Sequence, residues 1–77
     1  MDVNYLVVST LTEMFEESNH LFSEEMKYYL HNALASQGKD CTYEGLANII
    51  REWVENYPEI KTILGLKVAV KKVQSLT

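Results

Sequence analysis

Two histidines and one cysteine are the residues in this sequence best suited to metal binding or catalysis. Glu16 and Glu17 lie four and three residues before His20, so one side of a helix could place a carboxylate beside an imidazole. A zinc site needs three or four converging ligands, and the single thiol, Cys41, lies far along the chain. We therefore expect a surface histidine at position 20 and no bound metal.

Cys41 could be reactive only in a suitable electrostatic environment. It precedes Thr42, which we expect to cap a helix, and a helix N-terminus stabilises a thiolate. A reactive cysteine also needs a cation or a histidine nearby, whereas its sequence neighbour is Asp40. The three glycines are far apart and form no phosphate-binding loop. We expect no catalytic residue, no cofactor and no enzymatic activity.

Length and composition indicate one small domain. Its 77 residues are close to the lower limit at which a core suffices without help, although 47% of them are hydrophobic. A lone cysteine excludes an internal disulfide, which leaves regular helices, a partner subunit or both as the source of stability. The apolar run at residues 5–8 is too short for a signal peptide or a membrane span, so we expect a cytoplasmic protein that does not enter a membrane.

The charge is unevenly distributed along the chain. Residues 1–38 carry six acids and a single lysine, whereas residues 60–77 carry four lysines and no acid. The simplest explanation is a set of solvated helix faces and a last helix whose lysines complement its own dipole. The net charge of −4 argues against general affinity for nucleic acid.

Capping residues and apolar periodicity predict an all-α fold, a compact four-helix bundle that forms a single domain over residues 1–77. The expected helices span residues 3–17, 24–36, 43–56 and 58–74. The side chains expected to cap the first three helices are Asp2, Ser23 and Thr42. Gly38 and Pro58 are expected to end the second and third helices, and Gly65 could break the last one.

Each expected helix has an apolar stripe that should face the core. In the first helix the stripe is Val3, Val7, Leu11 and Met14, widened by Val8 and Phe15, with Tyr5 and Leu6 outside it. In the second it is Met26, Tyr29, Leu30, Ala33 and Leu34. In the third it is Leu46, Ala47, Ile49, Ile50, Trp53, Val54 and Tyr57. This arc is the widest, so we expect the third helix at the centre of the fold and Trp53 as a core anchor. In the fourth it is Ile63, Leu66, Ala69, Val70, Val73 and Leu76.

The last helix has a second apolar line, formed by Ile60, Leu64 and Val68, on the side away from its main stripe. Four lysines lie around this line: Lys61, Lys67, Lys71 and Lys72. The line is either internal to the bundle or a protein interface, and the sequence leaves both open. As an interface it is the first candidate interaction surface, and a homodimer would use it twice. Lys67 and Lys71 of one subunit would then approach the acidic side of the first helix of the other.

A second candidate surface lies on the expected solvent side of the second helix. Its members are Glu24, Tyr28, His31 and Asn32. Five tyrosines and one tryptophan are many for a chain of this length, and both residue types are enriched at protein interfaces.

These features favour a small non-enzymatic interaction module, a regulator, inhibitor or adaptor that acts through helix faces on a protein partner and self-associates. The alternative is a regulator that binds or mimics DNA. Residues 42–47 loosely resemble the opening of a helix-turn-helix motif, but residues 49–54 continue as helix where a glycine-bearing turn should follow. The last helix also lacks the arginines favoured for reading bases.

Overall fold

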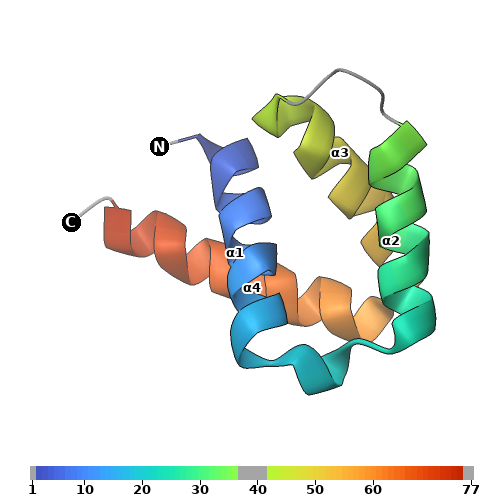
Figure 1. Ribbon diagram of the computed structural model, residues 1–77. Coiled ribbons are helices and arrows are strands. Elements are labelled where there is room, and N and C mark those ends of the chain that lie inside the picture. Colours follow the sequence, from blue (N-terminus) through green and yellow to red (C-terminus); the bar gives the residue numbers. More distant parts are fainter. Residues whose placement is uncertain (1, 37–41, 76–77) are drawn as a thin grey trace.

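A computed structural model describes residues 2–36 and 42–75, so the expectations for Gly38, Cys41 and Leu76 lie outside the described residues. Within these ranges the helices are α1 (Val3–Glu17), η1 (Asn19–Leu21, a 3₁₀ helix), α2 (Glu24–Ser36), α3 (Tyr43–Val54) and α4 (Pro58–Ser75) (Figure 1). No described residue belongs to a strand. The predicted all-α, four-helix fold is confirmed.

Local side-chain chemistry sets where the first three α-helices begin, as the sequence predicts. The Asp2 carboxylate accepts a hydrogen bond from the Asn4 backbone N–H at 2.9 Å. The Ser23 hydroxyl accepts from the N–H of Met26 at 3.2 Å, and the Thr42 hydroxyl accepts from that of Gly45 at 3.1 Å. Each cap satisfies one of the N–H groups that a helix start leaves without an intrahelical acceptor.

The ends of α3 and α4 differ slightly from expectation. α3 ends at Val54 rather than residue 56, and the Tyr57 N–H donates to the Val54 carbonyl at 2.9 Å in the turn that follows. α4 begins at Pro58 and continues without interruption through Gly65. The expected break is therefore absent, because one glycine weakens a helix by only about 1 kcal/mol and tertiary packing outweighs that cost.

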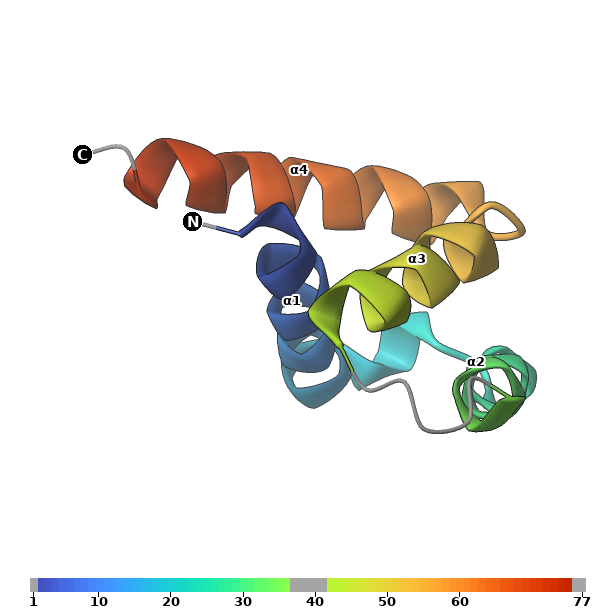
Figure 2. The ribbon, with the colours of Figure 1, turned by 90° about the horizontal axis from the view of Figure 1, so that it is seen from above.

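α3 is the central helix, as its wide apolar arc predicts. It packs against α1, α2 and α4, and α1 also packs against α4. Figure 2 shows α2 on the side of α3 away from α4, so that α3 lies between these two helices. Within residues 2–36 and 42–75 the core has thirteen buried apolar residues: Leu6, Val7, Leu11, Met14, Phe22, Leu30, Ala47, Ile50, Trp53, Val54, Ile60, Leu64 and Val68. Trp53 is only 5% exposed, which confirms it as a core residue.

The buried faces of α1 and α2 differ in part from the expected stripes. Leu6, expected outside the stripe, is buried, whereas Val3, expected within it, is 38% exposed. α1 packs against both α3 and α4, and contact with two helices rotates its buried arc toward Leu6 and Thr10. Tyr29, expected in the core, is 52% exposed, because α2 packs against α3 and buries only Leu30 completely.

Candidate protein interface on helix α4

The line expected as a candidate interface lies inside the molecule. Ile60, Leu64 and Val68 are 3%, 5% and 7% exposed and belong to the core cluster. They occupy the side of α4 that packs against α1 and α3. Of the two possibilities that the sequence leaves open, the internal one is therefore correct, and these three residues are withdrawn from the candidate surface.

The apolar residues of α4 that do face solvent are those expected in the core. Ala69 is also exposed, so the expected main stripe of this helix is wrong there as well as at the three larger residues Leu66, Val70 and Val73, which are 64%, 55% and 63% exposed. They are spaced four and three residues apart, which places them in one row along the helix. We call Leu66, Val70 and Val73 the α4 row.

The position of α4 in the fold explains why the α4 row is uncovered. α4 runs across α1, and its C-terminal end projects past α1, away from α2 and α3 (Figures 1 and 2). No other described helix lies over this outer side of α4. The α4 row therefore follows the free side of a helix whose opposite side is held in the core.

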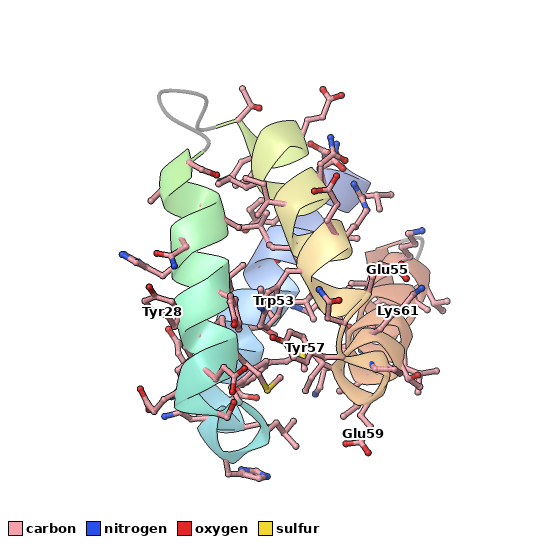
Figure 3. All side chains as sticks on the ribbon, turned by 90° about the vertical axis from the view of Figure 1, so that its right-hand side faces the viewer. Tyr28, Trp53, Glu55, Tyr57, Glu59 and Lys61 are labelled. Carbon is pink, nitrogen blue, oxygen red and sulfur yellow. The ribbon has the colours of Figure 1, made fainter. Side chains whose placement is uncertain are left out.

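Lys61 and Lys71 form ion pairs with acids of the same chain. Lys61 Nζ lies 2.7 Å from Glu55 Oε1, and both side chains extend from the junction of α3 and α4 (Figure 3). Lys71 Nζ lies 2.8 Å from Glu13 Oε1 and ties α4 to α1. Lys71, expected near the acids of a second subunit, instead pairs with an acid of its own chain, because α1 crosses α4 at this point.

Two shallow grooves lie along α4, and residues of the α4 row line the first of them but not the second. One, of about 350 Å³, is lined by Glu13, Leu66, Lys67, Val70, Lys71 and Gln74. The other, of about 390 Å³, has an apolar floor that includes Val7, Leu64 and Val68. Its rim carries Arg51, Lys61 and Lys72 together with Glu55. The four predicted lysines thus line these two grooves, Lys67 and Lys71 the first and Lys61 and Lys72 the second. The second groove adds Arg51, which was not among the candidate residues predicted from the sequence.

Arg51 is held in place by neighbouring amides. Its guanidinium donates to the side-chain oxygen of Asn48 at 3.1 Å and to that of Asn4 at 3.0 Å. Asn4 is in α1 and Arg51 is in α3, so this contact fixes a cation at the groove beside α4. A spacing of 47 residues separates the two partners, and no local sequence signal could have identified the pair.

The second predicted surface, on α2, is exposed as expected. Glu24, Tyr28, His31 and Asn32 all face solvent. Tyr28 points away from the bundle (Figure 3) and meets the ring of Tyr29 edge-on, with centroids 5.9 Å apart. Glu24 Oε1 lies 3.5 Å from Lys27 Nζ. Their exposure agrees with the prediction, and a binding role for them stays a prediction.

A wider groove between α2 and α3 was not predicted. It has a volume of about 650 Å³, and its walls include Tyr29, Ile49, Glu52, Trp53 and Tyr57. The sequence places Tyr29, Trp53 and Tyr57 in the core, where they would close this space. The groove exists because α2 turns only part of its apolar stripe toward α3, a consequence of tertiary packing that periodicity does not reveal.

The described residues form neither a metal-binding group nor a membrane-spanning helix. His20 and His31 are exposed, and residues 2–36 and 42–75 contain no group of three His, Cys, Asp or Glu that could hold a metal ion. Within the same residues no helix has the length and apolar character needed to cross a bilayer.

No protein-family model, no curated protein and no solved structure matches the chain. Functional inference therefore depends on the surfaces described above.

Proposed function

We propose that this protein is a small non-enzymatic interaction module, a regulator, inhibitor or adaptor that binds another protein through α4. The observation that supports the proposal is the exposure of the α4 row, with Leu66, Val70 and Val73 each more than half accessible to solvent. Burying one such side chain in a partner stabilises a complex by about 1.5–3 kcal/mol. Three of them in a row supply a centre around which a specific interface can form.

The rigidity of α4 also suits a binding role. Ile60, Leu64 and Val68 anchor its inner side, and the Lys71–Glu13 ion pair connects it to α1. A surface that is already ordered loses little conformational entropy when it binds. The α2 surface around Tyr28 lies on a helix that buries only one residue completely, so we rank it second.

Self-association through a homodimer stays a prediction, but the surface available for it has changed. The line formed by Ile60, Leu64 and Val68 is in the core, so the α4 row is the apolar surface of this helix that a dimer could use. Two copies joined in this way would bring Lys67 and its equivalent into the same interface. Like charges in an interface are unfavourable, and we expect such a dimer to be weak.

The DNA-binding alternative receives less support. The lysines of α4 would attract phosphates, but they line two different grooves, with Lys67 and Lys71 in one and Lys61 and Lys72 in the other. Glu13 and Glu55 lie among the same lysines and would repel a phosphate backbone. The cytoplasmic location, like the absence of enzymatic activity, stays a prediction.

Affinity capture from the cells that produce the protein tests the proposed function. The wild-type chain, Val70→Glu and the α2 variant Tyr28→Ala would serve as baits under the same conditions, after circular dichroism has shown equal helicity. We expect one or more proteins to be retained by the wild type and Tyr28→Ala and lost with Val70→Glu. The same set of proteins on all three baits would contradict a role for α4.

A further inference from the structure

The groove of about 390 Å³ beside α4 lies where three helices meet. Val7 comes from α1, Val54 from α3, and Leu64 and Val68 from α4. These four side chains are core residues, each 7% exposed or less, so the floor of the groove is the outer surface of the core. We call it the three-helix groove. Its volume is within the range of about 300–1,000 Å³ typical of small-molecule sites.

The rim of the three-helix groove is positively charged, although the chain has a net charge of −4. Arg51, Lys61 and Lys72 lie there with one acid, Glu55, whose Oε1 is 2.7 Å from Lys61 Nζ. Arg51 is held by two neutral amides and makes no ion pair among the described residues. Those two hydrogen bonds use two of the five N–H donors of a guanidinium. The groove therefore combines an apolar floor with a fixed cation that can still donate to an anion.

Gly65 keeps one wall of the three-helix groove open. It lies inside α4, lines the groove and is exposed. Glycine is unfavourable in the interior of a helix. Packing within the protein does not require it here, because a Cβ at this position would meet no atom within 4 Å. A ligand in the groove accounts for a glycine that the fold itself does not need.

From these observations we infer that the three-helix groove binds a small amphipathic anion, an alkyl carboxylate of medium chain length. The alkyl chain lies over Leu64 and Val68 beside Gly65, and the carboxylate accepts hydrogen bonds from Arg51. Such charge-assisted bonds to a guanidinium are stronger than neutral ones and orient the ligand. No residue of the α4 row lines this groove, so the inference is independent of the proposed function.

Other ligands and other grooves fit less well. A cationic amphiphile would be repelled by Arg51, and an anion without an alkyl chain would leave the apolar floor uncovered. The groove between α2 and α3 has Glu52 in its wall and no cation among its described lining residues. In the groove beside the α4 row, Glu13 lies next to Lys67 and Lys71. Carboxylates in both of these grooves would oppose an anionic head group.

Titration of the ¹⁵N-labelled full chain with octanoate, followed by the chemical shifts of its backbone amides, tests the inference. We expect the largest shifts at groove residues such as Val7, Gly65 and Val68. Decanoate should bind more tightly than octanoate, because the longer chain covers more of the apolar floor. Octan-1-ol, which has the same chain without the charge, should bind several-fold more weakly, and octylammonium more weakly still. Acetate should leave these shifts unchanged.

Two substitutions separate the contribution of the apolar groove from that of the cation. Gly65→Leu fills the groove and should weaken octanoate binding at least tenfold while helicity, measured by circular dichroism, is retained; Gly65→Ala should have a smaller effect. Arg51→Gln should remove most of the preference for octanoate over octan-1-ol. Lys67→Gln loses the same charge outside the three-helix groove, so it is the control and should change neither affinity.

Several results would overturn the inference. They are an absence of shifts at the groove residues, equal affinity of the wild type for octanoate and octan-1-ol, and undiminished octanoate binding by folded Gly65→Leu. A loss of affinity in Lys67→Gln as large as that in Arg51→Gln would indicate a general effect of charge rather than a site. Phosphatidylglycerol vesicles that bind with dependence on Gly65, in place of octanoate, would assign the groove to a membrane surface.

Discussion

Trp53 donates its indole N–H to the backbone carbonyl of Met26 at 3.0 Å, across 27 residues of sequence. The bond joins the middle of the fold to the first turn of α2, which among the described elements packs chiefly on α3. The indole ring also stacks on Phe22, with centroids 6.1 Å apart and planes inclined by 19°. One side chain therefore holds α2, the segment before it and α3 together.

Truncating Trp53 should remove most of the stability of the domain. Trp53→Ala leaves a large cavity, and such changes cost about 3–5 kcal/mol, comparable to the whole stability expected of a small domain. We expect the variant to be largely unfolded at physiological temperature in far-ultraviolet circular dichroism. Trp53→Phe keeps much of the apolar contact but leaves the Met26 carbonyl without this donor, so its loss should be smaller. A Trp53→Ala protein that melts like the wild type would contradict the central role of α3.

Leu64 and Leu66 are two leucines on one helix with opposite environments, 5% and 64% exposed. Leu64→Glu would bury a carboxylate with no partner and should cost about 4 kcal/mol or more, enough to unfold the domain. Leu66→Glu stays in solvent and should change the free energy of unfolding by about 0.5 kcal/mol or less. Urea denaturation measures both. Equal effects of the two substitutions would mean that α4 is rotated relative to this structure.

The helices were predictable from the sequence because their determinants are local. Asp2, Ser23 and Thr42 cap helices within a few residues of themselves, and Pro58 starts α4. The wide apolar arc of α3 was also informative, since a helix that is apolar over much of its surface must have neighbours on several sides. Trp53 was correctly placed in the core for this reason.

The rotation of α4 about its own axis could not be predicted in the same way. Its sequence offers two apolar lines, and the longer one, with Leu66, Val70 and Val73, is the exposed one. The buried line is the one that faces α1 and α3. The positions of these two helices depend on contacts between residues far apart in the sequence, which periodicity within α4 does not reveal. Because the α4 row was assigned to the core, the candidate surface was centred on Ile60, Leu64 and Val68, which are buried.

Thr10 is a polar residue at a core position, and this creates a stability test. It lies four residues from both Leu6 and Met14, has no exposed surface, and its hydroxyl has no hydrogen-bond partner among the described residues. An unpaired buried hydroxyl costs about 1–3 kcal/mol. Thr10→Val removes it at similar volume and should stabilise the domain by about 1 kcal/mol. Thr10→Ser, which keeps the hydroxyl and loses a methyl group, should destabilise it. A destabilised Thr10→Val would show that the hydroxyl has a partner.

The Lys71–Glu13 pair should contribute little to stability despite its short distance of 2.8 Å. The Glu13 side chain is half-exposed, and water and salt screen such pairs, which contribute about 0–1 kcal/mol. A double-mutant cycle with Glu13→Gln and Lys71→Met measures the coupling directly. We expect the coupling energy to fall as salt is raised from low to near-molar concentration. A coupling that is large and independent of salt would mean that the pair is shielded from solvent by something that covers this end of α4.

Gly65 is the residue of α4 whose replacement should stabilise the protein most simply. It lies within a continuous helix, is exposed, and a Cβ built at this position meets no atom within 4 Å. Alanine there reduces the conformational freedom of the unfolded chain and favours the helix, so Gly65→Ala should stabilise by about 0.5–1 kcal/mol. Ala69, exposed and one turn further along α4, provides the reverse experiment: Ala69→Gly should destabilise by a similar amount. Urea denaturation of both variants and the wild type measures the two shifts. If Gly65→Ala were destabilising while Ala69→Gly behaved as expected, the helix would have to depart from regular geometry at Gly65, and the break that the sequence suggests would be real in solution.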